Sequence, residues 1–307
     1  MKTFIKVIEI WIPDKERTQL EFGSGLYGGL TDFKKASEKQ HFDYDEGLPG
    51  KAWAAGHPIV LNGFEQSYFK RTAEAQKAGL TCGIAIPIFS GDFLLAVVVF
   101  LCGDDQEQAG AIEVWCNEGG AENSLHVLDG YYGSLQQFEN ISRQLIIPKG
   151  HGIPGAAWGA GMPVLIEDIG KAAESARASD AQKAEIGTGL GIPFIHDDEQ
   201  VFVITFLSAK ATPLAKRIQI WIPDAERRQL LCRQSYSKNS NNLAEIFEML
   251  TVNKGVGALG RVWLTGMPSI SGNQESAYNT ELDDLSSMLA IPVIEQGRLK
   301  AIVTFLF

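Results

Sequence analysis

Cysteine and histidine side chains are the groups in this sequence that could carry nucleophilic or metal-dependent chemistry. The four cysteines, Cys82, Cys102, Cys116 and Cys232, follow no spacing typical of a metal site or of a disulfide framework. The five histidines are scattered, and none follows His196. The sequence therefore predicts neither a metal site nor a catalytic triad.

Small polar side chains recur at one position of a threefold pattern. Cys82, Thr188 and Ser287 each lie five residues before the proline of an Ile-Pro pair. A second polar group follows an extended Gly-x-Pro segment and comprises Asn62, Glu167 and Asp168. We expect these side chains to contact a ligand, and Asp168 beside Glu167 could receive a cationic group. The alternative is that they are polar groups satisfied by hydrogen bonds at strand ends.

Six tryptophans reveal an internal repeat. They form three pairs: Trp11 with Trp53, Trp115 with Trp158, and Trp221 with Trp263. The spacing within a pair is 42, 43 and 42 residues, and corresponding members are 104 to 106 residues apart. Self-similarity at a fixed period indicates repeated structural units. We predict three domains, residues 1–103, 104–210 and 211–307, each of a size that can build its own core.

Charge is concentrated in the middle copy. Residues 104–210 carry 16 acidic and 6 basic residues, a net charge of −10, whereas the first and third copies carry −1 and +1. An acidic surface argues against nucleic-acid binding. The longest apolar run, residues 93–102, is half the length of a membrane span. With no visible targeting signal, we expect a cytoplasmic protein that contacts neither nucleic acid nor membrane.

Each copy shows the same order of predicted elements. In the first copy, strands are expected at 6–11 and 19–23, and a short helix around Trp53 lies between Pro49 and Gly56. A proline then forces an extended segment, which a polar helix at 67–78 follows. A hairpin at 84–100 closes the copy, because a Ser-Gly-Asp turn separates two apolar runs.

This order of elements resembles the GAF domain family. The resemblance rests on the three tryptophan segments that end in Gly-x-Pro, residues 47–58, 152–163 and 257–268, and on the three Ile-Pro hairpins. It implies an α+β fold with three repeats of a GAF-like domain. Each domain would be an antiparallel sheet flanked by helices, with a small-molecule pocket beside the sheet. In the third copy Leu259 replaces the proline found at Pro49 and Pro154.

Functional signatures of GAF families can be tested on the sequence. Members that bind cyclic nucleotides carry an Asn-Lys…Phe-x-x-x-Asp-Glu pattern, of which only Asn253-Lys254 is present. Bilin-binding members attach the pigment through a cysteine, commonly beside a histidine, and this sequence has no Cys-His pair. Members that reduce free methionine sulfoxide use clustered cysteines in one domain, and only the first copy has two, Cys82 and Cys102.

The first interpretation is a non-catalytic sensory or regulatory array that binds a small molecule in signalling. The alternative is a protein-interaction or oligomerisation scaffold without a ligand, and a minor one is a thiol-dependent methionine sulfoxide reductase. The sequence identifies no cofactor. A homo-oligomer or a signalling partner protein is expected.

The closing strands of each copy are apolar on both faces, so something must cover the second face. Val98 and Phe100 point to one side, and Val97 and Val99 to the other. The segments that join the copies are too short for the long terminal helices common in GAF domains. We therefore expect the copies to pack on each other, or chains to dimerise, with Trp11, Trp115 and Trp221 at the contact. Short joins also raise the alternative of strand exchange between copies.

Overall fold

The computed structural model describes residues 3–103, 110–117, 123–171, 177–195, 200–209, 211–237, 250–272 and 285–307. These residues form three repeats, each with one antiparallel six-stranded sheet. The three strand orders are β3-β2-β1-β6-β5-β4, β9-β8-β7-β12-β11-β10 and β15-β14-β13-β18-β17-β16. Each sheet contains only strands of its own repeat, so the described strands are not exchanged between repeats. The fold is α+β, as predicted.

The described elements of repeats 1 and 2 follow the predicted order, whereas the first helix and most of the polar helix expected in repeat 3 lie outside the described residues. Repeat 1 comprises β1 (Ile5–Pro13), β2 (Gln19–Leu26), α1 (Thr31–Ser37), β3 (His41–Asp43), α2 (Gly47–Ala55), β4 (Ile59–Asn62), α3 (Thr72–Lys77), β5 (Cys82–Ser90) and β6 (Phe93–Cys102). Repeat 2 comprises β7 (Gly110–Cys116), β8 (Ser124–Tyr131), α4 (Gln136–Gln144), β9 (Ile147–Pro148), α5 (Gly152–Ala160), β10 (Val164–Ile166), the 3₁₀ helix η1 (Ile169–Lys171), α6 (Ala178–Lys183), β11 (Ile186–Ile195) and β12 (Val201–Ala209). Repeat 3 comprises β13 (Arg217–Pro223), β14 (Gln229–Ser237), β15 (Thr251–Asn253), α8 (Gly257–Thr265), β16 (Ser269–Gly272), β17 (Ser287–Glu295) and β18 (Arg298–Leu306).

The helices that carry the second tryptophan of each pair end in the same way. Gly56, Gly161 and Gly266 follow α2, α5 and α8 with φ of 73°, 58° and 71°. This left-handed conformation is accessible to glycine without a steric penalty and stops the helix. The Gly-x-Pro pattern therefore ends a helix and starts the next strand at the same distance in every repeat.

The first tryptophan of each pair lies on the sheet face that the helices of its own repeat cover. Trp11, Trp115 and Trp221 are fully buried, each in a core made of residues from its own repeat. The prediction that they mark a contact between copies or chains is wrong. The face that carries them is closed within the repeat, because a helix layer packs directly on the indole rings and leaves them no exposed surface.

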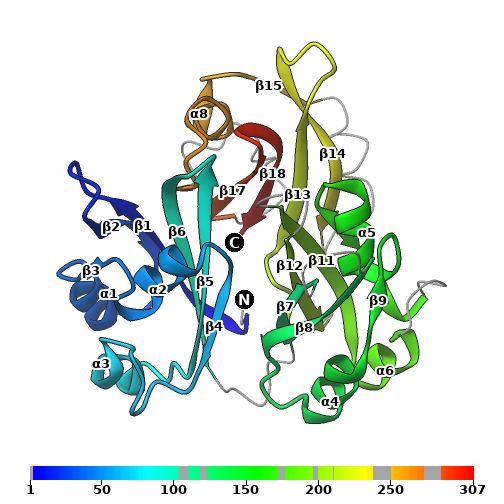
Figure 1. The fold of residues 1–307 in the computed structure, drawn as a ribbon, viewed down its shortest axis with the longest axis horizontal. Helices are drawn as coiled ribbons and strands as arrows, with labels where there is room; N and C mark the ends of the chain where they lie inside the picture. Colours follow the sequence, from blue (N-terminus) through cyan, green and yellow to red (C-terminus); the bar gives the residue numbers. More distant parts are fainter. Residues whose placement is uncertain are drawn as a thin grey trace.

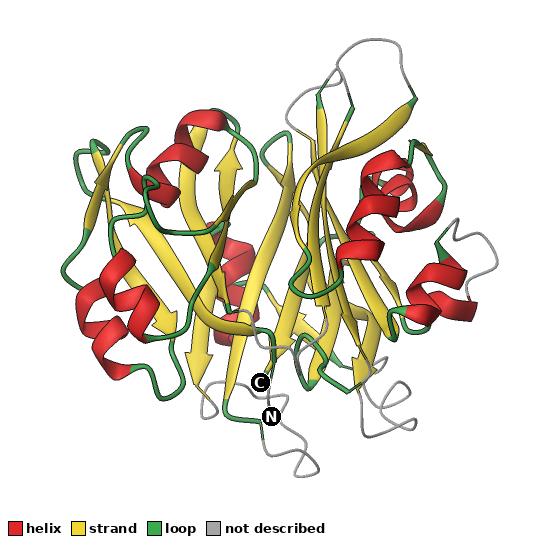
Figure 2. Cartoon of the chain, turned by 90° about the horizontal axis from the view of Figure 1, so that it is seen from below, coloured by secondary structure: helices red, strands yellow, loops and turns green. Residues whose placement is uncertain are grey.

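The opposite faces of the three sheets meet in one shared core (Figure 1). Phe100, Phe206 and Phe305 occupy equivalent positions, and their ring centroids are 5.3 to 6.3 Å apart in edge-to-face contacts. The helices lie on the outside and the strands toward the middle (Figure 2). The expectation that the copies pack on each other is confirmed. Dimerisation of two chains through these same faces is not confirmed, because the three repeats of one chain already cover them.

Neighbouring repeats also contact each other in a cyclic order. The Asn62 amide donates to the Gly130 carbonyl oxygen of repeat 2 at 2.9 Å, and the Gln234 amide of repeat 3 donates to the Leu165 carbonyl oxygen of repeat 2 at the same distance. Strand β16 of repeat 3 contacts β2 of repeat 1. His57 stacks on Phe202 with ring centroids 4.3 Å apart. The three repeats thus form a closed ring within one chain.

The described helices are all short. None of them is long and apolar enough to cross a membrane.

Candidate functional site

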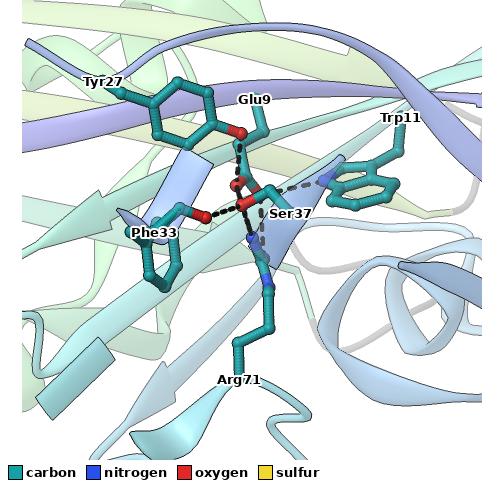
Figure 3. Close-up of polar contacts among 6 residues, drawn as sticks. All are labelled: Glu9, Trp11, Tyr27, Phe33, Ser37 and Arg71. Carbon is teal, nitrogen blue, oxygen red and sulfur yellow. Dashed lines mark hydrogen bonds and ion pairs between the residues drawn. The ribbon is translucent and has the colours of Figure 1, made fainter. Parts of the chain in front are cut away.

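A buried polar network lies between the sheet and the helices of repeat 1 (Figure 3). Glu9 of β1 is fully buried and pairs with Arg71, at 2.5 Å between Oε1 and Nη1 and 2.8 Å between Oε2 and Nη2. The Tyr27 hydroxyl, the Ser37 hydroxyl and the Trp11 indole also donate to this carboxylate, at 2.9, 2.8 and 3.0 Å. The network therefore joins β1 to α1, to the end of β2 and to the residue before α3.

Charge pairing decides the ionisation state of this network. Burial by itself would raise the pKa of Glu9, but the Arg71 guanidinium and the surrounding hydrogen-bond donors hold the pKa below its ordinary value. Burial and the nearby carboxylate raise the pKa of Tyr27. Glu9 is therefore a carboxylate and Tyr27 a neutral hydrogen-bond donor. Such a closed arrangement positions elements and offers no proton to a substrate.

Repeat 2 contains an equivalent ion pair with different hydrogen-bond donors: the Tyr132 hydroxyl has no hydrogen-bond partner among the described residues, and the Ser142 hydroxyl donates to the Phe138 carbonyl oxygen at 2.8 Å. Glu113 of β7 is fully buried and pairs with Arg177, at 2.5 Å between Oε1 and Nη1 and 3.0 Å between Oε2 and Nη2. Trp115 donates at 3.0 Å, and the Thr205 hydroxyl donates at 2.9 Å. Burial raises and Arg177 lowers the pKa of Glu113, with a net lowering. Repeat 1 has Val99 where repeat 2 has Thr205, so the first network lacks this hydroxyl.

Repeat 3 replaces the ion pair with neutral groups. Gln219 occupies the position of the glutamate and accepts from the Trp221 indole and the Thr304 hydroxyl, both at 3.3 Å. The sequence between Gly266 and Gly297 contains no lysine or arginine, so no equivalent of Arg71 or Arg177 exists there. A buried carboxylate without its cation costs far more free energy than a buried neutral amide. The change from glutamate to glutamine matches the loss of the arginine.

A small, partly open cavity lies beside the network of repeat 2. Its volume is about 170 Å³, and its wall combines apolar side chains with the buried Arg177 and the exposed His151. The apolar lining residues are Phe138, Ile146, Ile147, Pro148, Ile153, Pro154, Ile169 and Leu207. Ile146 at the edge of this cavity is 71% exposed, which is unusual for a large aliphatic side chain.

One side-chain difference creates this space. Phe42 of β3 and Ile147 of β9 are equivalent, because each is opposite the equivalent leucine of the neighbouring strand. In repeat 1 the Phe42 ring lies 2.5 Å from where a Cβ on Gly47 would be. In repeat 2 the Ile147 side chain is 3.8 Å from the same point on Gly152. The phenyl ring thus fills in repeat 1 a volume that is open in repeat 2.

The structure does not bring the six expected ligand residues together. Asn62 and Cys82 line a cleft of about 640 Å³ between repeats 1 and 2. Ser287 lines a different cleft, of about 490 Å³, between repeats 3 and 1. Thr188 is buried opposite Ser208 in the sheet of repeat 2. Their role in ligand binding stays a prediction.

The acidic pair of repeat 2 lies apart from both clefts and from the cavity wall. Glu167 directly follows β10, and Asp168 forms an ion pair with Lys171 at 3.3 Å.

Two sequence signals that would have located the buried networks were missed. Glu9, Glu113 and Gln219 each precede the first tryptophan by two residues, and both arginines precede an Ile-Pro proline by sixteen.

Neither metal nor triad chemistry is supported by the described part of the chain. No group of three or more His, Cys, Asp or Glu side chains within it could hold a metal ion. The four cysteines are buried and form no disulfide. The site therefore offers a shaped apolar space beside a fixed ion pair.

Comparison with known proteins identifies the class of domain. Residues 7–114 match the family model described as GAF domain. With three equivalent sheets of the same strand order, the chain consists of three tandem GAF-like domains. None of the curated proteins matches the chain.

Several solved structures are similar to one repeat. The free methionine-R-sulfoxide reductase from Neisseria meningitidis, in complex with its substrate, is 14% identical over 32% of this chain and 52% of its own, with a TM-score of 0.26. The nlh2 GAF domain from A. aeolicus is 22% identical over 34% and 61%, with a TM-score of 0.26. The GAF domain of a phosphoenolpyruvate-protein phosphotransferase from Coxiella burnetii is 21% identical over 32% and 56%, with a TM-score of 0.27. The matched part thus spans 52% to 61% of these chains.

Proposed function

We propose that this protein is a non-catalytic regulatory protein that binds a small molecule in repeat 2. The observation that carries the proposal is the partly open cavity of about 170 Å³ beside the Glu113–Arg177 pair. Concave sites lined by apolar side chains with few polar groups are typical of small-molecule pockets. GAF domains are typically sensory or regulatory, which agrees with a binding role rather than a chemical one.

The size and lining of the cavity favour a small neutral apolar molecule. An apolar cavity of about 150 Å³ in another protein stays dry and binds benzene. Here Arg177 is already neutralised by Glu113, so the wall does not call for an anionic ligand. The ligand class is therefore a single ring or a short branched chain, with the exposed Ile146 at the rim as an additional apolar contact.

An exchange of residues between repeats tests the proposal. Ile147→Phe copies the filled arrangement of repeat 1 into repeat 2. The matched control, Phe42→Ile, leaves the cavity of repeat 2 intact. Calorimetric titration with benzene, toluene and benzoate should detect binding of the neutral probes to the unaltered protein and to the control. In Ile147→Phe the affinity should fall by roughly tenfold or more, because a close-packed interior leaves no room.

Two outcomes would contradict the proposal: equal binding by Ile147→Phe and the unaltered protein, or no binding of any neutral probe. Native mass spectrometry of the purified protein would then measure its oligomeric state, because the scaffold alternative requires an extensive interface between chains. The main argument for that alternative was an uncovered sheet face, and the repeats cover that face.

The reductase alternative requires loss of activity on methionine sulfoxide in Cys82→Ser with unchanged folding.

A further inference from the structure

Cys82 and Cys102 occupy directly opposite positions in the sheet of repeat 1. The register of the antiparallel pair β5 and β6 places Cys82 against Cys102. Directly opposite residues of antiparallel strands have Cα atoms about 4.5 or 5.5 Å apart. Both spacings fall within the range of about 4.4 to 6.8 Å that a disulfide spans. The register therefore allows a disulfide between the two positions.

The fold does not require thiols at these positions. The equivalent pair is Thr188 opposite Ser208 in repeat 2. In repeat 3 it is Ser287 and Phe307, whose backbone N–H donates to the Ser287 carbonyl oxygen at 2.9 Å. Two hydroxyl side chains thus occupy these positions in repeat 2, and a hydroxyl and a phenyl ring occupy them in repeat 3. Packing by itself does not explain why two cysteines coincide only in repeat 1.

The pair is buried, but one of its members borders a cleft. Cys82 and Cys102 are 1% and 0% exposed. Cys82 lines the cleft of about 640 Å³ between repeats 1 and 2, together with Asn62 and Thr81. A small oxidant that enters this cleft reaches Cys82 first, because Cys82 lines the cleft and Cys102, opposite it on β6, does not. This order suits a two-step exchange in which Cys102 resolves an adduct on Cys82.

We propose that Cys82 and Cys102 are a redox-responsive pair that a low-molecular-weight disulfide, such as oxidised glutathione, converts into an intramolecular disulfide. The Cys82 thiolate attacks one sulfur of oxidised glutathione, breaks its S–S bond and releases one glutathione thiolate. The Cys102 thiolate then attacks Sγ of Cys82 and releases the second glutathione. The two cysteines together lose two electrons and two protons, and these electrons and protons pass to the two glutathione molecules that are formed.

The position of the pair links oxidation to the junction between repeats 1 and 2. The Thr81 N–H donates to the Cys102 carbonyl oxygen at 2.9 Å, and the Tyr131 hydroxyl of repeat 2 donates to the Gly103 carbonyl oxygen at 3.1 Å. A bond between β5 and β6 here fixes the end of β6, where the chain leaves repeat 1. Oxidation should therefore slow amide hydrogen exchange at Thr81 and Gly103.

The experiment equilibrates the intact protein in mixtures of reduced and oxidised glutathione, then quenches with acid and alkylates the remaining thiols in denaturant. In oxidising mixtures, peptide mass spectrometry should find only Cys116 and Cys232 alkylated, and a Cys82–Cys102 peptide lighter by two hydrogens. Reducing mixtures should return all four alkylated thiols. Four alkylated thiols in every mixture would overturn the proposal, and so would a glutathione adduct that persists on Cys82.

Two variants serve as controls. Cys102→Ser removes the resolving thiol, so glutathione should remain attached to Cys82 in the oxidising mixtures. The double variant Cys82→Thr with Cys102→Ser copies repeat 2 and should show no redox-dependent change in mass or in hydrogen exchange at Gly103. The cavity of repeat 2 shares no lining residue with the cleft at Cys82, so binding of neutral probes there tests the proposed function independently of this pair.

Discussion

At the scale of single residues, the buried ion pairs are the strongest constraint on this chain. Glu9 and Arg71 are 62 positions apart in the sequence and form two hydrogen bonds with each other, while Nε of Arg71 is buried without a hydrogen-bond partner in the described part of the chain. Removing one partner from such a pair strands a charge in the core, whereas removing both does not. In the third repeat both partners are absent, and Gln219 stands in place of the glutamate.

This contrast gives a prediction for Arg71. Arg71→Ser should lower the free energy of unfolding by about 3–5 kcal/mol, because Glu9 is left buried without its cation. Glu9→Gln combined with Arg71→Ser should recover a large part of that loss, since it restores a neutral core like that of repeat 3. Urea unfolding followed by tryptophan fluorescence measures both. A double variant no more stable than the single one would refute the explanation of repeat 3.

The same carboxylates predict how stability depends on pH. The pKa values of Glu9 and Glu113 are lowered in the folded protein, so the unfolded chain binds more protons in acid than the folded one does. Their contribution to stability is complete above their ordinary pKa of 4.5 and is lost as the pH falls through the lower folded values. Unfolding measured at neutral and acid pH should show this loss, and Glu9→Gln with Arg71→Ser should reduce it.

At the scale of elements, three helices end on a glycine in a left-handed conformation, and their surroundings differ. A Cβ on Gly56 would meet nothing within 4 Å, whereas one on Gly266 would lie 3.0 Å from Leu95 of repeat 1. The first glycine is needed for its backbone conformation only. Gly266 is needed for its conformation and for close approach between repeats.

This difference predicts an order of stability among matched variants. Gly56→Ala should cost about 1 kcal/mol, the penalty for a side chain in the left-handed region. Gly266→Ala should cost more, because Leu95 and Ile294 must also move. Thermal unfolding of the two variants compares them directly. If Gly266→Ala costs no more than Gly56→Ala, the close contact between repeats 3 and 1 is not a constraint.

At the scale of the whole molecule, the shared core makes the three repeats one folding unit. Phe100, Phe206 and Phe305 meet at its centre, each fully buried and each from a different sheet. A repeat on its own would expose this apolar face to water, at a cost of about 1.5–3 kcal/mol for each large side chain. The ring, rather than the single domain, is therefore the stable unit.

Truncation at the centre of the core tests this statement. Phe206→Ala should destabilise the protein by about 3–5 kcal/mol through lost burial and a residual cavity. It should speed hydrogen exchange in the central strands of all three repeats. The control, Leu125→Ala, alters a buried residue of the helix-side core of repeat 2. Its effect on exchange should be strongest in repeat 2, and an equally local effect of Phe206→Ala would argue against one unit.

The sequence by itself determined the period, the order of elements and the ends of the helices, because these depend on local features. Tryptophan spacing, strand alternation and the left-handed glycines are each readable within a few residues. Alternation also showed that both faces of the closing strands are apolar. It did not show which neighbour covers which face, and the tryptophans were assigned to the wrong contact for that reason.

Only the tertiary structure decided the rest, since each remaining feature joins residues distant in the sequence. Arg71 meets Glu9, Phe202 meets His57, and Cys82 faces Cys102 only once the sheets and the ring are assembled. The cavity of repeat 2 depends on how much volume Ile147 leaves where Phe42 fills repeat 1. Packing volume is a property of many side chains in three dimensions, so the repeat pattern predicts equivalent positions but not which of them remains open.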